Sequence, residues 1–156
     1  MVVQATLCHI MRGRKLLLKK ATRGISVGKW NGPGGKVERG ETPEAGAARE
    51  VFEETGLRVS NLFHHGTILF CMDGGRSLGI RVHLFSTSHF AGRVRSTEEG
   101  MVRWFPVDGL PWGEMWDDDR YWFPVMLSRG TFDARFYYDG ENRKVVEYEI
   151  HANNLR

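Results

Sequence analysis

Three glutamates, Glu50, Glu53 and Glu54, follow one another at the i, i+3 and i+4 spacing that places side chains on one arc of a helix. Like charges on adjacent turns destabilise an isolated helix by about 0.2–0.5 kcal/mol per pair, so a sequence that keeps three of them is expected to place a cation there. Carboxylate oxygens suit Mg²⁺, with Mn²⁺ as the alternative, because these ions bind through a few carboxylates, waters and substrate phosphates. The row of glutamates therefore predicts a divalent-cation site, against the alternative of a solvated acidic helix face.

The flanking residues predict where the helix that carries the glutamates begins and ends. Thr42 is a favoured N-cap residue, and Pro43 suits the first helical position, where its missing N–H removes no hydrogen bond. Gly56 follows the last periodic residue and is expected to end the helix. A glycine in mid-helix costs about 1 kcal/mol relative to alanine, so Gly46 predicts a close contact, for which the GPGG loop at 32–35 is the candidate.

The whole segment resembles the Nudix box, G-x5-E-x7-R-E-U-x-E-E-x-G-U, where U is aliphatic. All nine specified positions match, at Gly35, Glu41, Arg49, Glu50, Val51, Glu53, Glu54, Gly56 and Leu57. The resemblance implies metal-assisted hydrolysis of a nucleoside diphosphate linked to another group. It also implies an α/β/α sandwich with a mixed central sheet, an antiparallel hairpin and two main helices.

The resemblance assigns roles to the residues of the box and to one residue outside it. The implied metal ligands are Glu50, Glu53 and Glu54, with the carbonyl of Gly35 nearby. Arg49 is expected to orient the glutamates, and Lys36 to reach a phosphate. Glu99 is a candidate for a further ligand or base, and the general base stays open among Glu54, Glu53 and Glu99.

Two stretches, GKWNGPGGKVERGET and MWDDDRYWFP, extend the resemblance to a MutT-like subfamily that hydrolyses oxidised purine nucleoside triphosphates. The implied base pocket has Asn31, Asp118 and Asp119 reading the purine edge, Trp116 stacking on the ring, and Thr6, Ile25, Phe70 and Met72 as further lining. Ile25 and Met72 replace aromatic residues of the subfamily, which leaves the base preference open. Neighbouring carboxylates in an apolar pocket are expected to share one proton. The alternative is that the aspartates cap a helix and the tryptophan belongs to the core.

The resemblance implies Mg²⁺-dependent hydrolysis of modified purine (deoxy)nucleoside triphosphates, of the 8-oxo-dGTP or 2-hydroxy-dATP type, to the monophosphate and pyrophosphate. Such a reaction would remove damaged nucleotides from the precursor pool. One alternative keeps the chemistry and changes the substrate to a dinucleotide polyphosphate, ADP-ribose or an RNA 5′ end. Another is a Nudix module that binds a nucleotide without turnover.

Length and composition predict a single domain over residues 1–156. The chain is 41% hydrophobic and 26% charged, with a net charge of +3 and no block of like charges of the kind that binds nucleic acid. No apolar run approaches 18 residues, which predicts a cytoplasmic protein without a membrane partner. The expected partner is a nucleoside triphosphate, and the expected state is a monomer, with a dimer as the alternative. Cys8 and Cys71 are expected to be buried free thiols, and His64 and His65 to lie at the surface or at a strand edge.

Period-two alternation and turn signals predict the remaining elements. Strands are expected at 2–10, 15–20, 62–72, 77–86, 101–106, 131–138 and 144–150, and a second helix from the aspartates at 117–119 to about residue 128. Strands interrupted by two helices predict an α/β fold in which a mixed sheet has helices on its faces.

Overall fold

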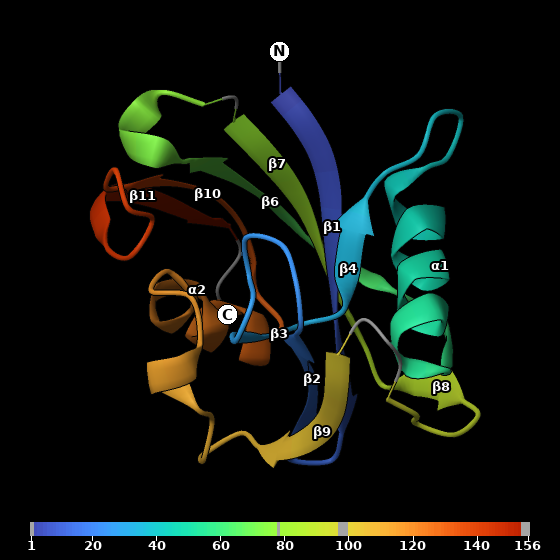
Figure 1. Ribbon diagram of the computed structural model, residues 1–156. Coiled ribbons are helices and arrows are strands. Elements are labelled where there is room, and N and C mark those ends of the chain that lie inside the picture. The colour runs from blue at the N-terminus through green and yellow to red at the C-terminus, as the bar shows by residue number, and fades with distance from the viewer. Residues whose placement is uncertain (1, 78, 97–99, 154–156) are drawn as a thin grey trace.

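The computed structural model describes residues 2–77, 79–96 and 100–153 (Figure 1). Its longer elements agree with the predicted ones, and it also contains short strands and two 3₁₀ turns. They are β1 (Val2–Arg12), β2 (Lys15–Ala21), β3 (Trp30–Asn31), β4 (Gly34–Lys36), α1 (Pro43–Thr55), β5 (Arg58–Ser60), β6 (Phe63–Cys71), η1 (Asp73–Gly75), β7 (Gly79–Thr87), β8 (His89–Ala91), β9 (Gly100–Pro106), η2 (Trp112–Glu114), α2 (Asp119–Leu127), β10 (Thr131–Tyr138) and β11 (Val145–Asn153).

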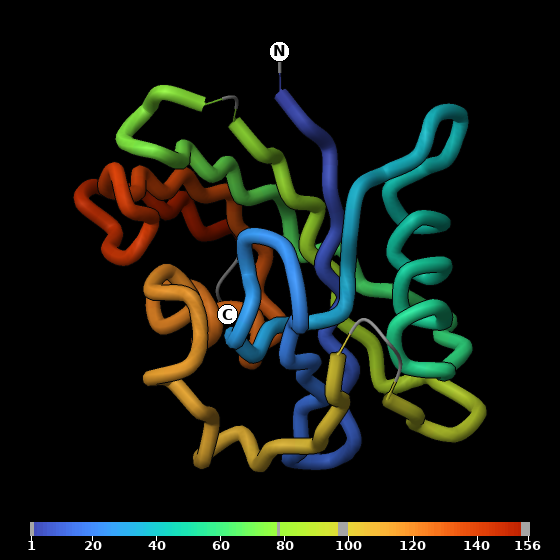
Figure 2. The backbone as a smooth tube through the Cα atoms, in the orientation of Figure 1, coloured from blue at the N-terminus to red at the C-terminus, as the bar shows by residue number. Residues whose placement is uncertain are grey.

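The main sheet is mixed, as predicted. Its strand order is β11-β10-β6-β7-β1-β2-β3, with β4 paired to β1 and β9 paired to β2. The β1–β7 and β6–β10 pairs are parallel, and the other pairs are antiparallel. Only the last two residues of β1 pair with β2, so the sheet divides there into two halves. The chain trace in Figure 2 shows β1 passing through the middle of the molecule, beside β4.

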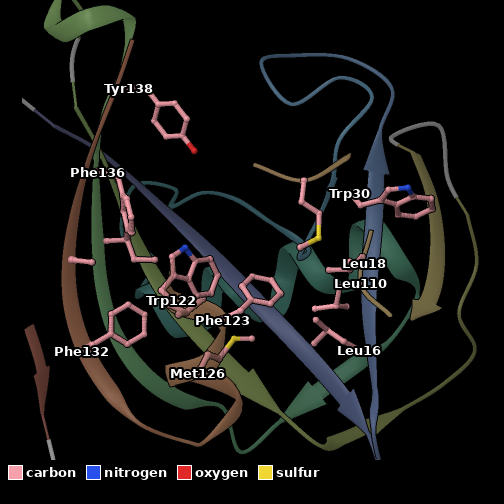
Figure 3. Close-up of a cluster of buried hydrophobic side chains, with 14 of the residues drawn as sticks. Leu16, Leu18, Trp30, Leu110, Trp122, Phe123, Met126, Phe132, Phe136 and Tyr138 are labelled. Carbon is pink, nitrogen blue, oxygen red and sulfur yellow. The ribbon is translucent and has the colours of Figure 1, made fainter. Parts of the chain in front are cut away.

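Helices cover both faces of this sheet, so neighbouring residues of one strand pack into two different hydrophobic cores. In β2, Leu17 packs in a core with Ala47 and Val51 of α1, whereas Leu16 and Leu18 face the core around α2. Figure 1 shows the two helices on opposite sides of β1 and β4. In Figure 3, side chains of α2 lie between those of β10 and those of β2. The predicted α/β/α sandwich is therefore confirmed.

Three smaller expectations need correction or addition. Cys8 is buried as expected, but Cys71 is only half-buried at the end of β6. His65 is buried, not at the surface, and its ring nitrogens lie 2.8 Å from the Gly130 carbonyl oxygen and 2.6 Å from Ser86 Oγ. The pair of strands formed by β5 and β8 was not predicted, since three residues carry too little periodicity.

Within the described ranges, no helix combines the length and the apolar character needed to cross a membrane.

Candidate active site

Helix α1 begins and ends where the sequence predicts. Thr42 Oγ1 accepts a hydrogen bond from the N–H of Ala45 at 3.1 Å, and Pro43 is the first helical residue. Gly56 closes the helix in the left-handed conformation, at φ 83°. The helix packs against β1 and β4, with Glu50 against Gly35 and Glu54 against Gly34 of β4.

Arg49 is the centre of a network that holds the box side chains in place. Its guanidinium contacts both oxygens of Glu41, at 2.8 and 3.0 Å, and donates to Glu50 at 2.8 Å. Weaker contacts at 3.3 Å reach Glu53. Hydrogen bonds from Arg49 are the main reason why the pKa of Glu41 falls to about 2. Arg49 thus contacts two of the three predicted ligands, Glu50 and Glu53, and its orienting role stays a prediction.

The close contact at Gly46 is made by Glu41, and not by the loop at 32–35 as predicted. A Cβ on Gly46 would lie 2.8 Å from Glu41 Oε1, so glycine leaves room for the carboxylate that binds Arg49. The loop glycines have other close neighbours. A Cβ on Gly34 would lie 1.9 Å from the carbonyl oxygen of Thr6, and one on Gly35 would lie 2.6 Å from the carboxylate carbon of Glu50.

Glu54 differs from Glu50 and Glu53 because it is buried and forms an ion pair with Lys19. It is 4% exposed, its Oε2 lies 2.5 Å from Lys19 Nζ, and its Oε1 accepts the N–H of Gly34 at 2.8 Å. Burial raises the pKa of Glu54 to about 7, and the hydrogen bond from Lys19 opposes that rise. A carboxyl group with a pKa in this range is suited to accept a proton near neutral pH.

The donor atoms at the box are those that a hard divalent cation prefers, namely carboxylate oxygens and a backbone carbonyl. The Glu50 carboxylate lies in a cradle against Gly35 that a Cβ would fill, and the Gly35 carbonyl accepts a long hydrogen bond of 3.4 Å from Thr6 Oγ1. The residue types therefore fit the predicted cation. In the part of the chain that the structure describes, however, no three acidic, histidine or cysteine side chains are grouped to hold a metal. Ligation by Glu50, Glu53, Glu54 and Gly35 stays a prediction.

A cavity of about 370 Å³ begins at the box and runs between the two halves of the sheet. Its wall includes Gly35 and Lys36 from the box, together with Lys19. All eight predicted base-pocket residues line it: Thr6, Ile25, Asn31, Phe70, Met72, Trp116, Asp118 and Asp119. The fold thus brings together residues from β1, β3, β6 and α2 and from the loops beside them, and one cavity connects them with the box.

Asp118 does not cap a helix, although it occupies the N-cap position of α2. It makes no side-chain capping bond. Its Oδ1 accepts the Tyr138 hydroxyl at 2.5 Å, and its Oδ2 accepts the Trp122 indole N–H at 2.7 Å. The backbone N–H of Asp118 donates to the same Tyr138 oxygen at 2.9 Å. Asp118 is therefore held by the core, which argues against the capping alternative.

Asp119 is buried next to Asp118 and has an unpartnered oxygen. Both residues are 2% exposed, and Asp119 Oδ2 is a buried atom for which the described residues supply no hydrogen-bond partner. Burial raises the pKa of both carboxyl groups, and the neighbouring charge of Asp118 raises that of Asp119 further. These directions agree with the expectation that the pair holds one proton.

The other pocket residues differ in how firmly they are held. Trp116 is anchored by a hydrogen bond of 2.9 Å from its indole N–H to Ser26 Oγ and by edge-to-face contact with Tyr138. Asn31 Oδ1 accepts the N–H of Gly32 at 2.9 Å. Ile25 lies on the cavity wall but is 57% exposed, so it belongs to the entrance and not to the floor.

Sequence reasoning missed Lys19 and Tyr138 and assigned no role to Trp122. Alternation along β2 places Lys19 on the same side as Leu17, which faces α1, so a pairing with the box helix was detectable in principle. No pattern in the sequence connects Tyr138 with Asp118, because their contact depends on how β10 packs against α2. The predicted candidate Glu99 lies outside the described residues.

Comparison with known proteins shows the family of the chain. A family model described as the NUDIX domain matches residues 2–126. An oxidized purine nucleoside triphosphate hydrolase of Mus musculus is 40% identical over 145 residues, covering 93% of this chain and 92% of the mouse protein. The protein of the same description from Danio rerio is 39% identical over the same coverage. A crystal structure of a mutator MutT protein from Bacillus halodurans superposes with a TM-score of 0.84 at 24% identity, covering 96% of this chain and 97% of that one, which supports the fold alone.

Proposed function

Since the chain belongs to the Nudix family of hydrolases, we propose that it hydrolyses oxidised purine (deoxy)nucleoside triphosphates, with Mg²⁺, to the nucleoside monophosphate and pyrophosphate. The observation that carries this proposal is the buried pair Asp118–Asp119, which lines the same cavity as Asn31, Trp116 and the box residue Lys36. The mouse and zebrafish relatives are oxidized purine nucleoside triphosphate hydrolases, which supports this substrate class. As an enzyme of the nucleotide pool, the protein would act in the cytoplasm.

The cavity suits a purine because it combines an apolar slot with polar groups in a few fixed places. Trp116 and Phe70 supply flat apolar surface, while Asp118, Asp119 and Asn31 supply hydrogen-bonding groups. A carboxyl pair with one proton offers both a hydrogen-bond donor and an acceptor, and a purine edge likewise presents a donor next to an acceptor. A site built to hydrogen-bond an edge rejects analogues that lack it far more strongly than an apolar slot does.

The phosphates of a nucleotide bound in this way would extend towards Gly35 and Lys36. Lys36 is exposed at the end of β4 and lines the cavity, so its flexible side chain can turn its ammonium group towards a phosphate. Arg49 keeps Glu50 and Glu53 oriented, and the Glu50 carboxylate lies against Gly35, which lines the cavity. When bound by the glutamates, Mg²⁺ supplies neutralisation of the phosphate oxygens and activation of water.

Among the candidate general bases, we favour Glu54. Its pKa near 7 and its two fixed hydrogen bonds, from Gly34 and Lys19, place a single carboxylate in a defined orientation beside the cavity. In the proposed step, water forms a bond to the β-phosphorus and loses its proton to the carboxylate. The bond from the β-phosphorus to the α,β-bridging oxygen breaks, and the monophosphate leaves. Reaction in ¹⁸O-water is then expected to label the pyrophosphate, whereas label in the monophosphate would contradict attack at the β-phosphorus.

The test of the purine-reading role uses Asp118→Ala and Asp119→Ala. Each change removes the proposed hydrogen bonds to the base, which are worth about 1–3 kcal/mol each, so kcat/KM for 8-oxo-dGTP should fall by about 10²-fold or more relative to kcat/KM for a pyrimidine triphosphate. Asp117→Asn is the matched control, since Asp117 accepts the N–H of Val145 and does not line the cavity. If the purine and pyrimidine activities fall equally in both alanine variants, the aspartates support the helix and do not read the base.

A further inference from the structure

Lys19 lies on the cavity wall between the base pocket and the box. It is the direct cross-strand partner of Asn31 in the β2–β3 pair, and partners of this kind point their side chains to the same face of a sheet. Its ammonium nitrogen lies 2.5 Å from Glu54 Oε2, and Glu54 Oε1 accepts the N–H of Gly34 in β4. A nucleotide with its base at Asn31 and its phosphates at the box would therefore pass Lys19.

Lys19 is less exposed than the other cationic residues of the cavity wall. Among the described residues, the cationic side chains that line the cavity are those of Lys19, Arg23 and Lys36. Arg23 and Lys36 are exposed, whereas the side chain of Lys19 is only 13% exposed. A hydrogen bond from an ammonium group to an anion becomes stronger as water is excluded from it. Lys19 can therefore contribute more to the binding of an anion than an exposed lysine does.

The ammonium group of Lys19 has more donors than Glu54 uses. A lysine ammonium carries three N–H groups and no acceptor. Within the part of the chain that the structure describes, the hydrogen-bond partner of this group is Glu54 Oε2 alone. Two donors are therefore left for a ligand, and the side chain lines the cavity in which that ligand would lie.

We propose that Lys19 binds the phosphate group nearest the sugar of the nucleotide, while it keeps its hydrogen bond to Glu54. This inference rests on the proposed function, which places the base at Asn31 and the phosphate chain at the box. Lys19 then joins the carboxylate that we favour as general base to the phosphate that leaves with the nucleoside. This phosphate gains negative charge as the bond from the β-phosphorus to the bridging oxygen breaks, and a fixed ammonium group beside it stabilises that charge.

The deciding experiment measures, by calorimetry in EDTA, the binding of 8-oxo-dGMP and of 8-oxo-deoxyguanosine, which lacks the phosphate. The ratio of the two dissociation constants reports on the phosphate, because a change in the base pocket affects both ligands and cancels. In Lys19→Met the affinity for the monophosphate should fall relative to that for the nucleoside by about 10-fold or more. Lys20→Met is the matched control, since Lys20 pairs with Glu114 and does not line the cavity, and its ratio should equal that of the wild type.

A second pair of variants tests the inference even if Lys19→Met fails to fold. Glu54→Gln and the double variant Lys19→Met/Glu54→Gln both lack the buried carboxylate that the loss of Lys19 would leave unpaired. If Lys19 contacts the phosphate directly, the double variant should bind the monophosphate about 10-fold more weakly, relative to the nucleoside, than Glu54→Gln does. Equal ratios in these two variants would overturn the inference, since they would show that Lys19 acts only through Glu54.

A failure of the proposed function would look different. If the wild type binds neither 8-oxo-dGMP nor 8-oxo-deoxyguanosine, the pocket does not take an oxidised purine, and both the function and the role of Lys19 are contradicted. If the wild type binds both ligands and Lys19→Met leaves their ratio unchanged, the proposed function stands and Lys19 does not bind the phosphate.

Discussion

Replacing Lys19 by methionine tests the environment of Glu54. The two side chains form an ion pair of 2.5 Å, and they are only 13% and 5% exposed. Methionine has a similar length and keeps the apolar part of the lysine stem, so the main change is the loss of the positive charge. Lys20→Met is the matched control, since Lys20 is the next residue along β2 and pairs with the exposed Glu114.

The size of the effect follows from the pKa of Glu54. Folding raises this pKa from an ordinary value near 4.5 to about 7, so the wild type loses stability from Glu54 as the pH rises between those values, and no more above about 7. An adjacent opposite charge lowers the pKa of a carboxyl group by about 1–3, so the loss of Lys19 should raise that of Glu54 by this amount. The variant then keeps losing stability above pH 7, by about 1.4 kcal/mol for each pH unit, or about 1.4–4 kcal/mol in total.

The assay is urea denaturation of the metal-free proteins between pH 6 and pH 9. At pH 6 the Lys19→Met variant should have a free energy of unfolding close to that of the wild type, because Glu54 is largely protonated in both proteins. The variant also avoids the cost of burying a charged lysine. At pH 9 it should be less stable than both the wild type and Lys20→Met. A stability loss that is the same at every pH would refute the reasoning, since it would show that Lys19 contributes packing and not charge.

Three other variants test the remaining parts of the site. Glu53→Gln keeps the shape of the side chain and removes its charge, so kcat should fall by about 10²-fold or more. The melting temperature without metal should stay equal or rise, because a repulsion between like charges is removed. Wild-type turnover would show that Glu53 is not part of the active site. Gly35→Ala places a Cβ 2.6 Å from the carboxylate carbon of Glu50 and should lower kcat strongly, whereas Gly113→Ala, with no heavy atom within 4 Å of its Cβ, should not. Asp119→Asn removes a carboxyl group whose pKa is raised by folding. The stability that the wild type loses as the pH rises above about 4 should therefore be smaller in the variant. If urea denaturation gives both proteins the same change of unfolding free energy with pH, the raised pKa of Asp119 is contradicted.

Local chemistry explains why the helix was predictable in detail. Thr42, Pro43 and Gly56 each act through neighbours in the chain, so the bounds of α1 follow from the sequence alone. The strands followed from alternation, apart from those of three residues or fewer. The two cores also follow from alternation, since adjacent leucines of β2 face opposite sides.

Contacts between distant segments were harder to predict. Lys19 and Glu54 are 35 positions apart; alternation along β2 indicates only that Lys19 faces α1, and does not select Glu54 as its partner. Asp118 and Tyr138 are 20 positions apart, and nothing in the local pattern connects them. The three glutamates share an arc of α1, yet Glu54 turns to Lys19 while Glu50 and Glu53 turn to Arg49, because the sheet buries one side of that arc. The pocket residues were identified by resemblance, and no periodicity would have selected Asn31 together with Asp118.

The most direct test of the central claim is a nucleotide panel with Mg²⁺, in which the nucleotide products, pyrophosphate and orthophosphate are all measured. The panel includes 8-oxo-dGTP, unmodified dGTP, a pyrimidine triphosphate, a dinucleotide polyphosphate and ADP-ribose. We expect the highest kcat/KM for 8-oxo-dGTP, with pyrophosphate and monophosphate formed in equal amounts. Release of orthophosphate from the triphosphate, or faster hydrolysis of the dinucleotide or of ADP-ribose, would contradict the proposal.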